Sequence, residues 1–407
     1  MSAAARMPAA RDEAPTRPPS SMNAPRQLLR GITWDHPRGH APLQATARLF
    51  AEQRPDIGIV WEKRSLRGFE EAPLEQLAAD YDLLVIDHPF VGQAARQGCL
   101  LPLDEHLPAE FLAEQAAHPV GPSHASYRFG GHQWALAIDA AAPVAFWRVD
   151  LLRHFRAGVP PTWEDVLALA RSGHVEIPAA PINCLMNFFA FCLALGEAPF
   201  SSPGRVVSAG TGRDALGRLR ELLAHCDPGC RNRNPIASHD LLASAENQHL
   251  AYCPLAYGYS NYARAGFAAH RLTFGEPPAF GGSPLRTVLG GAGLALSARR
   301  PRQPAALAYA PFVASPEIQR TLYTASGGQP GHRDAWLDLE NNRLSGGYFI
   351  RTLPALDRAW MRPRHAGYGA FQRHAAAVVH AALFDHLTDT ETLTRLNDLH
   401  RAAPETP

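Results

Sequence analysis

The sequence predicts an α/β protein in which mixed, mostly parallel sheets are flanked by helices. Two observations lead to this class. Short apolar runs that fit buried strands alternate with longer segments at helical spacing along most of the chain. Near the start, a strand, a helix and a second strand fall within roughly 30 residues, the length of a βαβ unit. A chain of 407 residues also exceeds one ordinary core, so more than one domain is expected.

The first βαβ unit lies close to the start of the sequence. Leu28–Trp34 is predicted as a buried strand, and Leu43–Arg54 places its apolar residues on one face of a helix. Pro55 ends that helix. Ile57–Trp61 forms the next strand, which is expected to run parallel to the first. A third apolar strand, Tyr81–Asp87, follows.

The alternation of strands and helices continues to the C-terminal region. Thr162 is predicted as a helix N-cap, because Asp165 stands three residues further on. Ser315, followed by Pro316, is a second start signal. The other predicted strands are Ala135–Ile138, Val144–Arg148, a run that ends near Tyr257, and Thr287–Ser297, and the other predicted helices are Arg213–Cys226, Pro304–Val313, Ser315–Ala325 and Ala370–Leu387.

Composition and charge exclude several classes of partner. The hydrophobic content of 46% with 19% charged residues is typical of a globular chain. A net charge of +1 gives no electrostatic reason to expect nucleic acid or an anionic membrane as the main partner. Residues 1–26 are rich in Ala, Pro, Arg and Ser and lack the apolar core of a secretory signal, so they are predicted to be a disordered tail.

Among the six cysteines, one pair is suggestively spaced. Cys226 and Cys230 flank Pro228 and Gly229, which turn the chain and bring the two thiols together. Plain thiols are the first interpretation, a disulfide the second, and a metal site that also uses His225 the third. The sequence leaves these alternatives open.

Three stretches in a fixed order resemble the bacterial extracellular solute-binding proteins of the carbohydrate ABC-importer type. They are "YRFGGHQWALAIDAAAPVAFWRVDLL", then "VPPTWEDVLALA", and finally "VLGGAGLALSARRPRQPAALAYAPFVASPEIQRTLYTASGGQPGHRDAW". The opening strand, helix and strand also match the start of that family, so the resemblance covers roughly residues 28–390.

The resemblance implies a two-lobed periplasmic-binding-protein fold of type II, in which a ligand is held between lobes joined by hinge crossovers. It places lobe one at 27–137 plus 270–312 and lobe two at 138–269 plus 313–400. It also implies a monomeric receptor that needs no cofactor and passes a small polar solute, such as a sugar or sugar acid, to an ABC permease. Closure of the lobes is a hinge motion.

The chain departs from the family in its N-terminal export signal. Members carry a secretory or lipoprotein signal, and none is visible here. The resemblance implies a periplasmic location. The alternative is a cytoplasmic binding or sensing protein of the same fold.

The candidate ligand contacts lie in polar segments at strand ends. Because the carboxyl ends of parallel strands meet at one edge of a sheet, the segments after the first and third strands are expected to lie together. Together with what the resemblance implies, this predicts the following ligand-binding residues: Trp34, Asp35, His36, Arg38, Asp87, His88, Asp139, Asn187, Tyr257, Tyr259, Asn261, Gly290, Gly291 and Arg333.

The chemistry expected of these residues is recognition of hydroxyl and anionic groups. Trp34 and the tyrosines offer flat walls, and Asp35 accepts paired hydroxyl bonds. Arg38 and Arg333 suit a carboxylate or phosphate. The competing interpretation is that Asp35 and His36 cap a helix that begins near Pro42.

The remaining candidates also have structural interpretations. Asp87 and His88 form a turn before Pro89 in the alternative reading, and Asn187 sits in an ordinary helix start. Gly290 and Gly291 let a ligand approach the backbone closely. An enzyme is not predicted, because no catalytic or metal-binding motif accompanies the two Asp-His pairs.

Overall fold

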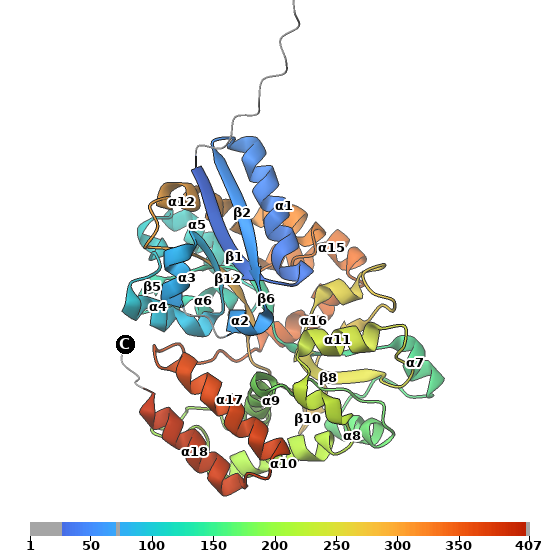
Figure 1. Cartoon of the computed structure of the whole chain (residues 1–407). Coiled ribbons are helices and arrows are strands. Elements are labelled where there is room, and N and C mark those ends of the chain that lie inside the picture. Colours follow the sequence, from blue (N-terminus) through green and yellow to red (C-terminus); the bar gives the residue numbers. More distant parts are fainter. Residues whose placement is uncertain (1–26, 71–73, 404–407) are drawn as a thin grey trace, which may run out of the picture.

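The computed structural model describes residues 27–70 and 74–403, which form two lobes stacked one above the other (Figure 1). The upper lobe is built on a five-stranded sheet and the lower lobe on a three-stranded sheet. The predicted disordered tail, residues 1–26, lies outside the described residues.

The five-stranded sheet of the upper lobe contains the predicted βαβ unit. Its order is β2-β1-β3-β12-β6. Both β2 and β3 run parallel to β1, as predicted, whereas β12 is antiparallel to both of its neighbours. The strands are β1 (Gln27–Trp34), β2 (Ile57–Arg64), β3 (Leu83–Ile86), β6 (Leu136–Ala141) and β12 (Gly290–Leu296).

Helices and one short hairpin surround this sheet. A buried apolar cluster that includes Leu43, Phe50, Leu294 and Tyr309 fills the space between the sheet and the helices. The elements are α1 (Pro37–Gln53), α2 (Leu66–Glu70), α3 (Leu74–Asp80), η1 (His88–Phe90), α4 (Val91–Gln97), η2 (Leu103–Glu105), α5 (Ala109–Ala117), α6 (Ser123–Ser126), β4 (Arg128–Phe129), β5 (His132–Gln133) and α12 (Gln303–Ala314).

The lower lobe is mostly helical around a small antiparallel sheet of order β8-β7-β9. The strands are β7 (Pro143–Trp147), β8 (Tyr252–Tyr257) and β9 (Thr273–Gly275), with a separate hairpin of β10 (Ala279–Phe280) and β11 (Ser283–Pro284). The helices are α7 (Val149–His154), α8 (Trp163–Arg171), α9 (Pro181–Ala194), α10 (Ala209–Leu223), η3 (Pro228–Asn232), α11 (Pro235–Ala243), η4 (Ser260–Ala263), α16 (Tyr348–Asp357), α17 (Tyr368–Phe384) and α18 (Asp389–Ala402).

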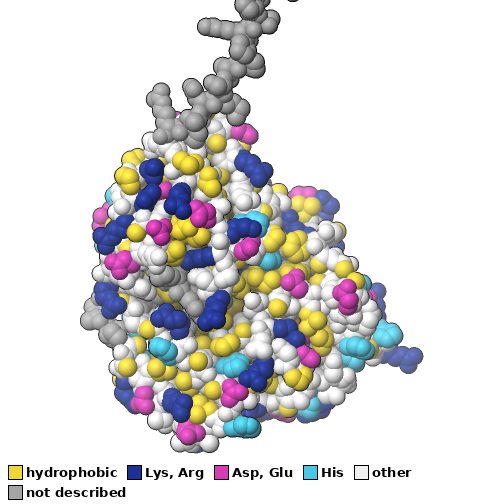
Figure 2. All heavy atoms as spheres, in the orientation of Figure 1, with side chains coloured by type: hydrophobic (Ala, Val, Ile, Leu, Met, Phe, Trp, Pro, Cys, Tyr) yellow, Lys and Arg dark blue, Asp and Glu magenta, His cyan; other side chains and the backbone are white. Residues whose placement is uncertain are grey.

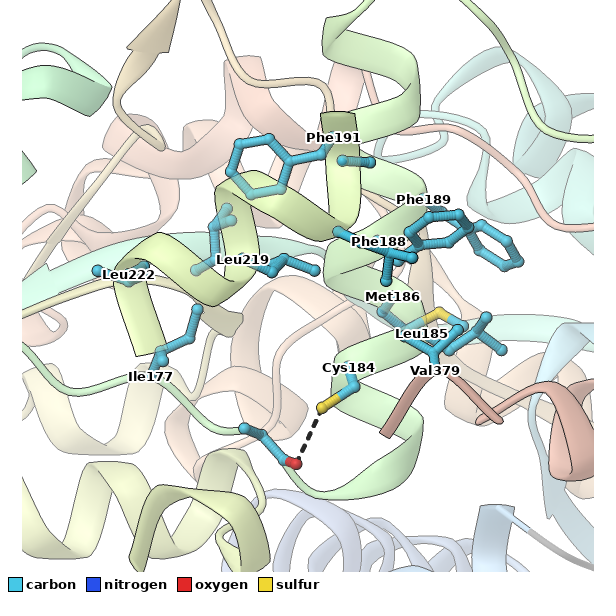
Figure 3. Close-up of a cluster of buried hydrophobic side chains, with 14 of the residues drawn as sticks. Ile177, Cys184, Leu185, Met186, Phe188, Phe189, Phe191, Leu219, Leu222 and Val379 are labelled. Carbon is cyan, nitrogen blue, oxygen red and sulfur yellow. Dashed lines mark hydrogen bonds between the residues drawn. The ribbon is translucent and has the colours of Figure 1, made fainter. Parts of the chain in front are cut away.

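The core of the lower lobe is centred on α9. This helix buries nearly all of its side chains, and α10 and α17 pack against it. Figure 3 shows Phe188, Phe189 and Phe191 of α9 among leucines of α10. Cys184 lies in the same core, where its thiol contacts the carbonyl of Ala179. Apolar residues occur on most sides of this helix, which explains why its sequence shows only a weak amphipathic pattern.

Two helix starts show how local sequence sets these elements. Thr162 caps α8 in a capping box with Asp165, as predicted. The prediction for α1 was wrong by six residues. His36 is its N-cap and Pro37 its first residue, so the helix begins directly after β1 and contains Pro42. Pro37 at the first position needs no N–H partner, which favours this early start.

The lobes are joined where β6 passes into β7 with one residue, Ala142, between them. The predicted lobe boundaries differ in detail from the observed sheets. Residues 138–141, assigned to lobe two, lie in β6 of the upper sheet, and β9, assigned to lobe one, pairs with β7 of the lower sheet. The segments that lie between the lobes are α13 (Pro316–Ile318), η5 (Gln319–Tyr323), α14 (Arg333–Leu337) and α15 (Leu339–Leu344).

The surface is charged without a dominant sign. Figure 2 shows Lys and Arg side chains interspersed with Asp and Glu over the visible face. Within the described part of the chain, no helix has the length and apolar character needed to cross a bilayer. All six cysteines are free thiols, including Cys226 and Cys230, so the predicted alternative of a disulfide is not observed.

A candidate ligand cavity between the lobes

A cavity of about 660 Å³, the solvent at its mouth included, lies between the two lobes. The upper wall consists of Trp34, Arg38, Leu66, Phe69, Asp87, Asp139, Ala141, Gly290, Gly291 and Ala292. The lower wall consists of Ile182, Asn183, Met186, Pro235, Tyr257, Tyr259, Arg362 and Gln372.

Predicted residues from several strand ends meet at this cavity. Those that line it are Trp34, Arg38, Asp87, Asp139, Tyr257, Tyr259, Gly290 and Gly291. They come from segments up to 257 positions apart, and they meet because β1, β3, β6 and β12 belong to one sheet. Ligand contact by these residues stays a prediction.

Arg38 is the most deeply buried cation at the cavity. It projects from the first turn of α1 and forms a bidentate ion pair with Asp139 of β6, with Nε at 2.8 Å from Oδ2 and Nη2 on Oδ1. Its remaining Nη1 donates to the carbonyl of Gly258 in the lower lobe at 2.8 Å. The guanidinium also stacks on the ring of Tyr259, 4.6 Å from its centroid.

A second buried ion pair spans the lobes. Arg362, in the segment between α16 and α17, donates Nη2 to both carboxylate oxygens of Asp87 at 2.8 and 2.9 Å. Its Nη1 donates to Gln372 of α17 at 2.8 Å. Burial by itself raises the pKa of Asp87, but Arg362 and the side chain of His88 outweigh it and lower that pKa to about 2. Asp87 is therefore ionised at neutral pH.

Polar atoms in the cavity wall lack partners within the described residues. Trp34 Nε1, Asn183 Oδ1 and Arg362 Nε are buried without a hydrogen bond. Two of them are donors and one is an acceptor. A buried polar atom left without a partner costs about 1–3 kcal/mol, so this set of atoms favours a ligand that both donates and accepts hydrogen bonds.

Apolar surface completes the wall. Trp34 and Phe69 lie with ring centroids 5.4 Å apart, and Ile182, Met186 and Pro235 face the cavity from the lower lobe. Flat and aliphatic surface beside a few fixed polar groups is the usual composition of a small-molecule site.

Some predicted residues lie elsewhere for reasons visible in the structure. Asp35 is exposed and pairs with Lys63 at 2.7 Å. His36 caps α1, and burial, together with nearby Arg38, lowers its pKa to about 3, so the ring is neutral. His88 is fully buried in η1 behind Asp87, with its ring edge toward Tyr127.

Three further predictions of ligand contact also fall outside the cavity wall. Asn187 lies one turn beyond Asn183 on α9, and only Asn183 reaches the wall. Asn261 donates to the carbonyl of Gly327 at 3.1 Å. Arg333 is engaged on the surface by a bidentate pair with Asp357.

Sequence reasoning missed the wall residues Leu66, Phe69, Arg362 and Gln372. Arg362 and Asp87 are 275 positions apart, and no local pattern links them. Arg362 stands in the stretch RAWMRPRH among other cationic residues, so the local sequence does not mark it as the buried one.

The glycines of β12 also have a structural role, besides the close ligand approach that was predicted for them. A Cβ on Gly290 would lie 2.5 Å from the ring of Tyr257, and a Cβ on Gly291 would lie 2.3 Å from the carbonyl oxygen of Asp139. Gly291 also has φ of 112°, which L residues rarely adopt. Both glycines therefore allow β12 to pass tightly beside its neighbours at the cavity.

Gly291→Ala is expected to destabilise the protein by at least about 1–3 kcal/mol, from backbone strain and from the displacement of β12 away from β6. Urea unfolding measures the loss. Gly217→Ala is the matched control, because Gly217 is exposed in α10 with nothing near its Cβ position. That change should stabilise by about 0.5–1 kcal/mol. Equal effects of the two substitutions would contradict the account of Gly291.

Comparisons with known proteins agree with this architecture. The sequence profile described as "Bacterial extracellular solute-binding protein" matches residues 47–337. No match was found among curated proteins. Among solved structures, the chain is similar to maltose-bound MalE3 of T. maritima, with a TM-score of 0.80 and 17% identity over 92% of this chain and 100% of that one.

Two Agrobacterium proteins illustrate the same similarity. An ABC transporter solute-binding protein of Agrobacterium radiobacter K84 in complex with ribitol gives a TM-score of 0.77 at 16% identity, covering 93% of this chain and 98% of that one. A corresponding protein of Agrobacterium vitis S4 with bound D-mannitol gives 0.72 at 14% identity, covering 92% and 98%. At these identities the similarity concerns the fold.

Proposed function

The chain belongs to the family of bacterial extracellular solute-binding proteins, and from this we propose that it binds one small, neutral, polyhydroxylated molecule between its lobes. The observation that carries the proposal is the set of partnerless buried atoms in the cavity wall, Trp34 Nε1, Asn183 Oδ1 and Arg362 Nε. Hydroxyl groups both donate and accept, so a single sugar or polyol satisfies donors and acceptors alike.

The charges at the cavity favour a neutral ligand over a sugar acid. Arg38 is paired with Asp139 and Arg362 with Asp87, so the wall carries two cations and two anions that already neutralise one another. An anionic ligand would have to displace a carboxylate from its arginine, which leaves a buried charge without a partner. Structural relatives with bound maltose, ribitol and D-mannitol agree with this ligand class.

Delivery to an ABC permease and a location outside the cytoplasm are part of the same proposal. They rest on the family, whose members are extracellular binding proteins. Cell fractionation with sequencing of the mature N-terminus tests this part. An unprocessed chain in the cytosol would instead favour a cytoplasmic binding or sensing protein of the same fold.

A thermal-shift screen is expected to identify the ligand class. A ligand present at 100 times its dissociation constant should add about 2.7 kcal/mol of stability. We expect such stabilisation from a neutral sugar or polyol, and less from the sugar acid with the same carbon skeleton. If only the acids stabilise, the argument from paired charges is wrong. Mass spectrometry of the ligand after its release checks that the ligand itself has not been chemically altered.

A further inference from the structure

A cluster of metal-ligating side chains lies away from the ligand cavity. Within residues 27–70 and 74–403, Glu114, His118 and His332 each offer one ligand atom, and these atoms lie within 4.8 Å of one another. Glu114 and His118 stand one turn apart at the end of α5, and His332 is the N-cap of α14. None of the three lines the ligand cavity.

Both imidazole rings converge on a single carboxylate oxygen. His332 Nε2 lies 2.7 Å from Glu114 Oε1, and His118 Nδ1 lies 3.2 Å from the same oxygen. The rings themselves are 5.5 Å apart between centroids. Two nitrogens and one oxygen therefore surround one point. A single dication at that point would replace the protons that the histidines share with Glu114.

We propose that Glu114, His118 and His332 form a binding site for a divalent transition metal, with Zn²⁺ as the test ion. Imidazole and carboxylate are ligands that Zn²⁺ favours, and bond lengths of about 2.0–2.2 Å place neighbouring ligand atoms of a tetrahedral site about 3.3 Å apart. The observed 2.7 and 3.2 Å separations need only small side-chain adjustments.

The surroundings suit a site that is held on one side and open on the other. The His332 side chain is 1% exposed, whereas His118 is 48% exposed, which leaves room for water as a fourth ligand. The backbone fixes the two segments together, since the amide of Arg333 donates to the carbonyl of His118 at 2.8 Å. The second oxygen of Glu114 accepts from Gln115 at 2.8 Å, which orients the carboxylate.

Zinc binding would also require a change of tautomer at His332. Its Nδ1 accepts a long 3.3 Å hydrogen bond from the amide of Asp334, so the ring proton sits on Nε2 and points at Glu114. Coordination through Nε2 moves that proton to Nδ1 and breaks the long bond.

Zinc titration of the untagged protein, in competition with a chromophoric chelator at neutral pH, tests the proposal. We expect one equivalent of Zn²⁺ to bind, and affinity to fall at least about tenfold in His118→Ala and in Glu114→Gln. Glu114→Gln keeps the size of the side chain and removes its charge. His118 is half exposed, so its loss leaves the fold intact, which circular dichroism verifies.

The matched control is His132→Ala. His132 is also a surface histidine beside carboxylates, with Nδ1 at 3.0 Å from Asp104 and 3.6 Å from Glu105. Within the described residues it does not belong to a group of metal-ligating side chains like that of Glu114. Its removal should leave zinc affinity unchanged. The proposal is overturned if no stoichiometric zinc binds, if His118→Ala binds zinc as tightly as the wild type, or if His132→Ala abolishes binding. The titration needs no sugar, so its result is independent of the proposed function.

Discussion

Arg38→Met is expected to lower the free energy of unfolding by about 3–5 kcal/mol, the usual cost of removing one partner from a buried ion pair. Asp139 would remain in β6 without its bidentate partner, and its side chain is fully buried. Both residues belong to the upper lobe, one on α1 and the other on β6. The two carboxylates of the cavity wall differ in burial, since the Asp139 side chain is 0% exposed and that of Asp87 is 10% exposed.

Equilibrium unfolding in urea, followed by circular dichroism and tryptophan fluorescence, measures this loss. The double variant Arg38→Met with Asp139→Leu should recover much of the stability, because it removes both charges and leaves apolar groups of similar size. Arg30→Met is the matched control: Arg30 pairs with Glu62 on the surface, with both side chains more than 40% exposed. That pair should contribute little to stability, because both charges are solvated. A loss below about 1 kcal/mol in Arg38→Met would contradict the account.

The contrast between α1 and α9 explains how much of the fold the sequence could predict. The βαβ unit was predictable because Leu43, Ala47 and Phe50 repeat at helical spacing between two apolar strands. In α9 apolar residues around Phe188 occur on every side, so periodicity could not give the bounds of the helix, although a helix start at Asn187 was considered. The start of α1 was misplaced because Pro42 was read as a beginning, although proline is tolerated there within the first two turns.

The candidate site divides along similar lines. The position of Trp34 and Asp87 at the cavity was predictable because strand ends of one sheet share an edge. Asp139 was included because of the family resemblance, and it lies within β6. Sequence neighbours of those residues, such as Asp35 and His88, were included although the sequence does not show where their side chains point. At a strand end the side chains of adjacent residues point in different directions. Arg362 was beyond reach, since its role depends on how the segment after α16 folds back across the lobes.

Arg362→Met is expected to weaken ligand binding by at least about 30-fold, which corresponds to about 2 kcal/mol. The ion pair with Asp87 joins the two lobes, so its loss destabilises the closed arrangement that encloses the ligand. Arg362 also lines the cavity, and its buried Nε has no hydrogen-bond partner within the described residues. Isothermal titration with the most stabilising sugar or polyol from the thermal-shift screen measures the change. Gln372, the second partner of Arg362, provides a milder comparison through Gln372→Ala.

The same substitution should cost less unfolding free energy than Arg38→Met, although both break a buried ion pair. Opening of the lobes gives Asp87 access to water, so the penalty cannot exceed the free energy of opening. Small-angle scattering of the ligand-free variant should therefore show a larger radius of gyration than the wild type. In the double variant Asp87→Ala with Arg362→Met the buried charge is gone, and the wild-type radius should return. If Arg362→Met instead unfolds the lower lobe without changing the shape of the folded protein, the ion pair stabilises the fold and does not control closure.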